Sequence, residues 1–194
     1  MLSEWSYYEN LFPKSLCETI VEKAKKLPLQ SGTVTEANKV DSEIRQSQIS
    51  WIDRGHPDFA NIFPTIDRCI AEANRKWFGL DYWQYGASSY QFTTYKAGKK
   101  GEKGDYYRPH QDSVLVNKGL SQRKISFTLQ LTDPKEYEGG QFIMQYVDQQ
   151  PPQDIIIQQG TMLIFPSLVF HGVHPITKGT RYSLVGWYEG PVFR

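Results

Sequence analysis

The sequence predicts one α+β domain, mainly β, in which helices pack against a β-sandwich or barrel. Apolar residues recur every three or four positions in two segments before residue 80, which is typical of amphipathic helices. From residue 88 onward they alternate in short runs between turn residues, which is typical of strands. A chain of 194 residues suits a single core. We therefore expect one domain over residues 1–194, with helical support over roughly 1–85 and the β core over roughly 86–194.

Two helices are expected in the N-terminal part. The first spans residues 15–27, where Ser15 and Glu18 have the spacing of a capping box and an apolar stripe follows, formed by Leu16, Ile20, Ala24 and Leu27. The second begins near Pro64 and ends at Gly79, and its inner face is formed by Ile66, Ile70, Ala73 and Trp77. The polar residues 43–52 between the helices are expected to be extended.

Six strands are expected in the second half, at residues 88–95, 124–131, 141–147, 154–158, 161–165 and 180–188. Gly98, Gly101 and Gly104 lie between two strands rather than before a helix, so they do not form a phosphate-binding loop.

Composition narrows the class of protein. A net charge of +1 and a pI near 7.7 argue against a nucleic-acid partner, and no segment has the length and hydropathy of a membrane span. The N-terminus lacks the pattern of a secretion signal, so we expect a cytoplasmic protein, with its oligomeric state open. Cys17 and Cys69 are expected on separate helices as reduced, buried residues, although a disulfide between them stays open.

His110 and Asp112 in "RPHQDSV" form a His-x-Asp pair just after the glycine-rich loop. If a strand begins there, residues i and i+2 point to the same side and both could reach one metal ion. The alternative is a loop histidine that bonds a neighbour. A second histidine would complete a site of two imidazoles and one carboxylate, which leaves about three positions open on octahedral iron(II). Structural zinc sites prefer four protein ligands, usually including cysteine, so iron is the better match.

Two histidines near the C-terminus compete for that role. His171 and His174 face opposite sides of an extended chain, so only one should enter a shared interior. His171 follows the apolar segment "IFPSLVF", whereas His174 precedes Pro175, where the chain is about to turn. We therefore expect His171 to bind the metal and His174 to be a surface or supporting residue.

Arg181 indicates which chemistry the metal serves. It shares one strand face with Ser183, Val185 and Trp187 in an otherwise apolar, aromatic segment. A guanidinium that points into the core needs an anionic partner, and its planar fork suits a carboxylate. The alternative is a structural salt bridge or an outward-facing edge residue.

Together, His110, Asp112, His171 and Arg181 resemble the iron(II)- and 2-oxoglutarate-dependent dioxygenases, above all the prolyl 4-hydroxylase-like branch with its PKHD-type hydroxylases. The likeness covers nearly the whole chain through four segments, namely "LFPKSLCETIVEKA", "QFTTYKAG…DYYRPHQDS", "ISFTLQLTDPKEYEGGQF" and "GTMLIFPSLVFHGVHPITKGTRYSLVGW". The resemblance implies a double-stranded β-helix, a cupin-like jelly-roll barrel with flanking N-terminal helices.

The resemblance also implies the roles of individual residues. His110, Asp112 and His171 would be the catalytic metal ligands for Fe(II), and Arg181 would bind the distal carboxylate of 2-oxoglutarate. Tyr95 and Ser183 would help to hold this cosubstrate. The iron and 2-oxoglutarate would react with O2, and whether the enzyme also uses ascorbate stays open. Gln130 departs from the family near a position where some relatives have tyrosine, and Arg45 lies in a family-like segment without an assigned role.

The implied reaction is hydroxylation of an unactivated C–H bond, with a prolyl or other amino-acid side chain as the leading substrate, free or in a peptide or protein. Tyr107, Gln111 and Trp187 are expected near the substrate, with Tyr106 and Arg108 as further neighbours; core packing is an equal alternative for Trp187. The loop 96–105 is either a lid or a solvated hairpin tip. A nucleic-acid demethylase is disfavoured because Trp187 stands where those sequences carry a second arginine. A metal-binding cupin without oxygenase activity and a carbohydrate-binding jelly roll remain the alternatives.

Overall fold

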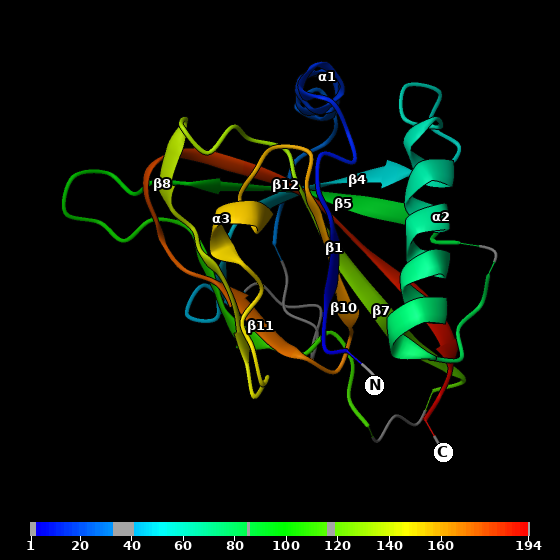
Figure 1. The fold of residues 1–194 in the computed structure, drawn as a ribbon. Helices are drawn as coiled ribbons and strands as arrows, with labels where there is room; N and C mark the ends of the chain where they lie inside the picture. Colours follow the sequence, from blue (N-terminus) through cyan, green and yellow to red (C-terminus); the bar gives the residue numbers. More distant parts are fainter. Residues whose placement is uncertain (1–2, 33–40, 85, 116–118, 194) are drawn as a thin grey trace.

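The computed structural model describes residues 3–32, 41–84, 86–115 and 119–193, which form two antiparallel sheets that face each other (Figure 1). The larger sheet follows the order β1 (Ser6–Tyr8), β10 (Met162–Pro166), β7 (Ser121–Gln130), β12 (Ile176–Pro191), β5 (Ser89–Lys96), β4 (Gln48–Asp53) and β2 (Gln30–Ser31), and β8 (Tyr137–Gly139) also pairs with β12. The smaller sheet follows the order β3 (Arg45–Gln46), β6 (Tyr106–His110), β11 (Phe170–Val173) and β9 (Phe142–Gln145). The expected mainly β fold is confirmed, but the two sheets do not close into a barrel.

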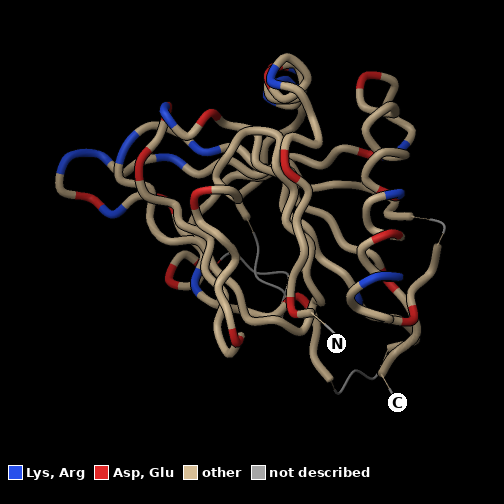
Figure 2. Tube along the Cα trace, viewed as in Figure 1, with Lys and Arg blue, Asp and Glu red and all other residues tan. Residues whose placement is uncertain are grey.

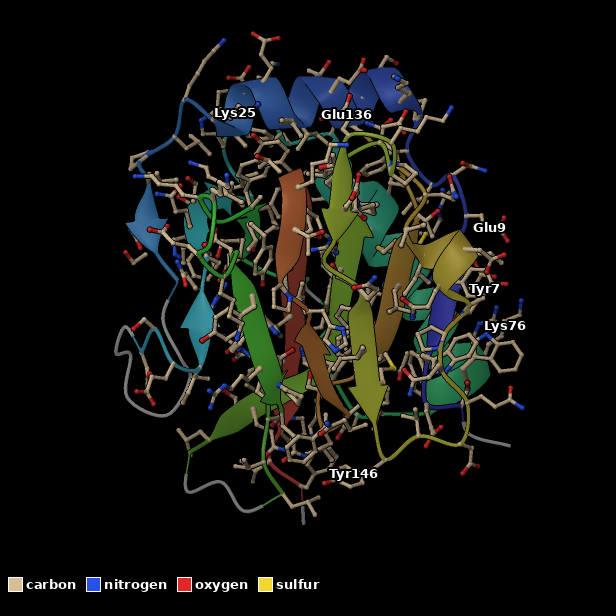
Figure 3. The ribbon with its side chains drawn as sticks, turned by 90° about the vertical axis from the view of Figure 1, so that its left-hand side faces the viewer. Tyr7, Glu9, Lys25, Lys76, Glu136 and Tyr146 are labelled. Carbon is tan, nitrogen blue, oxygen red and sulfur yellow. The ribbon has the colours of Figure 1, made fainter. Side chains whose placement is uncertain are left out.

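The helices cover the larger sheet on the side away from the smaller one. Helix α2 (Ile62–Ala73) lies along this outer face, and α1 (Lys14–Ala24) lies across one end of the sheets (Figures 1 and 3). Their apolar side chains form one buried cluster with the outer face, while a second cluster fills the space between the sheets. None of the described helices is long and apolar enough to cross a membrane.

Strand alternation separates these two clusters. On β5, Tyr90 and Phe92 join the helices in the outer cluster, whereas Gln91 and Tyr95 line a cavity between the sheets. On β12, the predicted face of Arg181, Ser183, Val185 and Trp187 lines the same cavity. The polar side chains of these central strands therefore face the cavity between the sheets. A cavity lined by such polar groups is where ligand binding is expected.

Both helices differ in detail from the sequence-based expectation. Pro13 is the N-cap of α1 and no side chain caps it, so the predicted capping box of Ser15 and Glu18 does not form. The helix begins one residue earlier, and the Ser15 carbonyl instead accepts a hydrogen bond from Thr19 within the first turns. Helix α1 also ends at Ala24 rather than at residue 27.

Helix α2 continues as the π-helix η1 (Asn74–Phe78), which Gly79 ends in a left-handed conformation at φ 61°. A π turn contains an extra residue, so it rotates the following side chains relative to an α-helical stripe. Trp77, predicted on the inner face, is consequently 43% exposed, and Phe78 is buried in its place.

The strand predicted at residues 154–158 is wrong, because this segment forms the short helix α3 (Gln153–Ile156). Pro152 caps the helix, and Ile156 packs between the sheets. Short apolar runs do not by themselves separate a strand from a buried helical turn. Residues 1–85 are also not only helical support: β1, β2, β3 and β4 all come from this part of the chain. The extended segment predicted at 43–52 corresponds to β3 and β4.

The loop between β5 and β6 projects from the body of the protein and carries charges of both signs (Figure 2). The amide of Ala97 donates to Gly179, and that of Asp105 donates to Lys96, so the loop base is fixed as a hairpin. None of residues 96–105 lines the cavity, which favours the hairpin-tip alternative over a lid. Cys17 and Cys69 are buried and unpaired on α1 and α2, as predicted.

Candidate functional site

The smaller sheet brings together two histidines that are far apart in sequence. His110 ends β6 and His171 lies on β11, where the two residues are direct cross-strand partners with ring centroids 4.4 Å apart. Gly172 allows this close pairing, because a Cβ at this position would lie 2.8 Å from the backbone oxygen of Tyr107. Strand pairing rather than local sequence therefore creates the pair of imidazoles.

Both imidazoles present the same nitrogen to the interior. His110 Nδ1 lies 3.0 Å from the Arg108 carbonyl oxygen, and His171 Nδ1 lies 2.9 Å from that of Val169. A carbonyl can only accept, so each Nδ1 carries the proton and each Nε2 offers a free lone pair. Both histidines are thus held in the tautomer that suits a metal ligand.

Asp112 supplies a carboxylate to the same point, but not in the way the sequence suggested. Strand β6 ends at His110, so Asp112 reaches the site from a bend rather than as residue i+2 of a strand. Its amide donates to the Ser167 carbonyl, which fixes the bend. Its Oδ1 lies 3.7 Å from His110 Nε2, and its Oδ2 lies 3.4 Å from His171 Nε2.

The ionisation states of these groups suit a cation. Burial lowers the pKa of His171 to about 4, although the charge of Asp112 acts in the opposite direction, so the ring is neutral at pH 7. Burial acts to raise the pKa of Asp112, but His171, His110 and Arg123 outweigh it and hold the carboxyl pKa well below its usual range. A buried, ionised carboxylate is stabilised by a nearby cation, and Arg123 Nη1 approaches Oδ1 only to 3.9 Å.

The three ligand atoms of His110, Asp112 and His171 lie within 4.8 Å of one another. Two imidazole nitrogens and one carboxylate oxygen on one side of an ion form the facial donor set of non-haem iron(II) sites. The donors therefore fit iron(II). His174 is exposed and does not belong to this cluster, so the structure brings in the histidine that the sequence favoured.

A cavity of about 200 Å³ extends from the three ligands between the sheets. Arg181 enters its wall and is only 5% exposed, with Nη1 3.4 Å from Ser183 Oγ. Within the described part of the chain, no carboxylate forms a salt bridge with Arg181. Gly140, at φ 66°, leaves room for this side chain, because a Cβ there would lie 3.2 Å from Arg181 Cδ. A buried guanidinium without a carboxylate partner among the described residues can accommodate an anionic ligand.

Tyr95 and Arg45 line the same cavity beside Arg181. Tyr95 is the cross-strand partner of Arg181, with the guanidinium carbon 5.9 Å from its ring centroid. Burial raises the pKa of Tyr95, while Arg45 and Arg181 act to lower it, so the phenol stays neutral and can donate to a ligand oxygen. Arg45 is buried and its Nε donates to Ser47 Oγ at 2.8 Å. The sequence did not assign a role to this second interior guanidinium, because nothing local to residue 45 marks it as buried.

The mouth of the cavity is aromatic. Trp187 lies on its wall with the Arg123 guanidinium 3.8 Å from its ring centroid, and Trp51 lies 6.3 Å from Trp187 between ring centroids. These three residues also line a second, more open hollow of about 600 Å³, whose lining includes Trp83. Arg123 and Trp51 were not predicted, because each reaches the mouth only through the sheet arrangement.

Of the other residues predicted near the substrate, Tyr107 lines the cavity, and Gln111, Tyr106 and Arg108 do not. Tyr107 lines the cavity, and its ring stacks on His110 with centroids 3.5 Å apart. Gln111 does not line the cavity, and its amide donates to the Leu168 carbonyl instead. The Tyr106 hydroxyl donates to the carbonyls of Ser42 and Glu43, and Arg108 is exposed.

Comparison with known sequences shows the family to which the chain belongs. The sequence model of the 2OG-Fe(II) oxygenase superfamily matches residues 90–189, which contain the three ligands and Arg181. The chain belongs to this superfamily. Members of this oxygenase superfamily use Fe(II), 2-oxoglutarate and O2, and the His-Asp-His cluster fits that set. The sugar-binding and non-oxygenase alternatives are thereby disfavoured.

Individual proteins that are similar to this chain are PKHD-type hydroxylases. A PKHD-type hydroxylase of Prochlorococcus marinus is 40% identical over 90 residues, which are 46% of this chain and 39% of the relative. A PKHD-type hydroxylase from another strain of that organism, NATL2A, is 29% identical over 185 residues, or 94% of this chain and 77% of the relative. The Prochlorococcus marinus relative and two further PKHD-type hydroxylases are matched over only about two-fifths of their own length.

Solved structures show the same fold as this oxygenase chain. A prolyl-4-hydroxylase of Pseudomonas putida superposes with a TM-score of 0.71 at 22% identity, over 97% of this chain and 93% of the other. A prolyl hydroxylase of Trichoplax adhaerens, in complex with a hypoxia inducible factor peptide fragment, superposes with a TM-score of 0.74 at 17% identity, over 96% and 83%. The double-stranded β-helix expected from the sequence is confirmed by these neighbours.

Proposed function

We propose that this protein is an Fe(II)- and 2-oxoglutarate-dependent dioxygenase that hydroxylates an amino-acid side chain, with a prolyl residue of a peptide or protein as the leading substrate. The observation that carries this proposal is that two features share one cavity. They are the cluster of His110, Asp112 and His171, and the buried Arg181 without a carboxylate partner among the described residues. A metal site alone would not need the guanidinium.

The chain's own residues position the reactants. His110, Asp112 and His171 would hold iron(II) between their imidazole nitrogens and carboxylate. Arg181 binds the distal carboxylate of 2-oxoglutarate through charge-assisted hydrogen bonds, and Ser183 supports its guanidinium. The neutral phenol of Tyr95 donates a hydrogen bond to an oxygen of the same cosubstrate. Iron(II) bound there would supply the oxidising chemistry, in which O2, 2-oxoglutarate and the substrate C–H bond yield succinate, carbon dioxide and the hydroxylated product.

The walls of the cavity keep water from the reacting groups. Tyr107 packs on His110, while Trp187 lies at the opening with Arg123 over its ring. Because the cavity is small and its apolar wall extends over the ligands, a substrate side chain can enter while its backbone stays outside. The mouth therefore selects what approaches the metal.

A peptide suits this mouth better than a free amino acid. The second hollow continues from Trp51 and Trp187 toward Trp83, so residues flanking the hydroxylated one would lie on aromatic surface. Proline-rich extended segments bind to such aromatic-lined grooves. The peptide bound by the Trichoplax neighbour supports the same substrate class. Cytoplasmic location and the absence of nucleic-acid and membrane partners stay predictions from the sequence.

Succinate release tests this function directly. The protein with Fe(II), ascorbate, O2 and 2-oxoglutarate is screened against proline-containing peptides and free amino acids, and the product is located by mass spectrometry. We expect succinate in a one-to-one ratio with a hydroxylated peptide. The His110→Ala variant should abolish both products, whereas His174→Ala, which changes an exposed histidine outside the cluster, should not. Undiminished succinate from His110→Ala would contradict the assignment.

A further inference from the structure

Two buried serines connect to the carboxylate of Asp112. Ser126 Oγ lies 2.7 Å from Asp112 Oδ2 and 2.8 Å from Ser167 Oγ. Both serines are 0% exposed. Ser126 belongs to the central strand β7, and Ser167 directly follows β10. Two neighbouring strands of the larger sheet therefore support the residue that lies in the bend after β6.

The direction of these hydrogen bonds follows from the donors. An ionised carboxylate can only accept, so the single proton of Ser126 is donated to Asp112. Ser126 then has only lone pairs left for Ser167, so Ser167 donates to Ser126. The two bonds form a one-way chain that ends at Oδ2, and such chains strengthen each bond in a low-dielectric interior.

The backbone fixes the ends of this chain. The amides of Asp112 and Ser113 both donate to the Ser167 carbonyl, and the Ser167 amide donates to Lys124 on β7. These backbone bonds hold the Asp112 main chain beside the two serines, and the hydrogen bond from Ser126 then fixes which way its Oδ2 points. Oδ1 lies 3.7 Å from His110 Nε2 and 3.9 Å from Arg123 Nη1, and the Ser126 hydrogen bond to Oδ2 leaves it to face a metal.

The number of carboxylate oxygens on the metal matters for this reaction. Two histidines and one carboxylate oxygen leave about three positions of an octahedral ion. The carboxylate and keto oxygens of 2-oxoglutarate need two of them, and O2 needs the third. If Asp112 used both oxygens, only two positions would remain and the cosubstrates would compete for them.

We propose that Ser126, supported by Ser167, is a positioning residue that keeps Asp112 a one-oxygen ligand and so preserves the position that O2 requires. The inference rests on the proposed function, because it concerns the same metal and cosubstrate. Neither serine lines the cavity or contacts the substrate, and each acts only through Asp112.

The test uses nitric oxide as a probe for the O2 position, under anaerobic conditions, in protein loaded with Fe(II) and 2-oxoglutarate. Its binding is followed by the electron paramagnetic resonance signal of the nitrosyl complex, and 2-oxoglutarate binding is measured separately by calorimetry. Ser126→Ala should still bind Fe(II) and 2-oxoglutarate, but its affinity for nitric oxide should fall about tenfold to a hundredfold, the usual effect of losing a residue that orients a metal ligand. Ser167→Ala should show a smaller fall, because Ser126 can still donate.

Two further variants control for folding. Ser50→Ala also removes a buried hydroxyl, but Ser50 Oγ has no hydrogen-bond partner among the described residues and does not line the cavity, so nitric oxide binding should not change. Ser126→Thr keeps the donor and should restore the affinity lost in Ser126→Ala. Thermal melting of each variant reports its folding.

Each outcome of these measurements supports or overturns the proposed role of Ser126. Unchanged nitric oxide affinity in Ser126→Ala overturns the proposal, and so does complete loss of Fe(II), which would mean that the serine is needed for metal binding itself. Failure of the unmodified protein to bind Fe(II) or 2-oxoglutarate would instead overturn the proposed function. A selective loss of nitric oxide binding, restored by threonine, supports the proposal.

Discussion

Arg181→Met should change the stability of the protein in opposite directions with and without 2-oxoglutarate. Methionine has nearly the length of the arginine stem and no charge, so it removes the guanidinium while keeping apolar contact in the cavity wall. Arg181 is 5% exposed, its Nη1 donates to Ser183 Oγ at 3.4 Å, and within the described residues no carboxylate pairs with it. The charge is therefore costly until an anion binds.

The magnitudes follow from burial. An ion withdrawn from water costs several kcal/mol, and access of solvent to the cavity reduces this, so we expect Arg181→Met to stabilise the ligand-free protein by about 1 kcal/mol. For a chain of this size that raises the melting temperature by about 2–4 °C. Removing one partner of a buried ion pair costs about 3–5 kcal/mol, so the affinity for 2-oxoglutarate should fall about a hundredfold or more.

The assay is a thermal melt of metal-loaded protein with and without 2-oxoglutarate, together with a calorimetric titration. At a concentration a hundred times its Kd, the cosubstrate should stabilise the unmodified protein by about 2.7 kcal/mol and the variant hardly at all. Arg68→Met, on the exposed face of α2, is the matched control and should leave both measurements unchanged. A variant that is less stable without ligand yet binds 2-oxoglutarate normally would refute the assignment of Arg181 as its receptor.

Three further predictions concern the metal site. His171→Ala should lose Fe(II) and His174→Ala should retain it, as metal analysis after desalting can show; the reverse result would exchange their roles. Because burial holds the pKa of His171 near 4, below its unfolded value of about 6.5, the unfolded metal-free chain takes up a proton before the folded one does. Stability should therefore fall by up to about 3 kcal/mol as the pH drops from about 6.5 to about 4, and denaturant unfolding of His171→Ala should show a shallower fall over that range; an equal fall would contradict a neutral buried His171. Gly172→Ala should lower Fe(II) affinity about tenfold or more, because the new Cβ meets the Tyr107 backbone oxygen and separates β11 from β6. Gly55→Ala, whose Cβ would meet nothing within 4 Å, is its control, and equal affinities in the two variants would show that this strand contact is not needed.

Much of the site could be predicted from the sequence, because the alternation of side chains along a strand is a local property. The period of two on β12 placed Arg181, Ser183 and Trp187 on one face, and the structure finds all three on the cavity wall. Errors arose where local signals compete. The apolar run at 154–158 became a helical turn after Pro152, and a π turn moved Trp77 to the surface.

The residues that sequence reasoning missed share one cause. Arg45, Arg123 and Ser126 have ordinary neighbours in the chain, and each becomes important only through contacts with a distant strand. Arg45 pairs with Tyr107 across the smaller sheet, and Ser126 contacts Asp112 from the opposite sheet. Without the pairing of the strands, none of these contacts can be inferred from spacing.

By itself, the sequence determined the candidate metal ligands and the strand face of Arg181, because a ligand type and a strand face depend only on residue identity and on the geometry of a few consecutive residues. Tertiary structure alone decided the register that sets His110 opposite His171, the bend that turns Asp112 toward them, and the serine chain that fixes its carboxylate. These features depend on hydrogen bonds and packing between segments tens of residues apart, whose relative positions are set only when the whole core assembles.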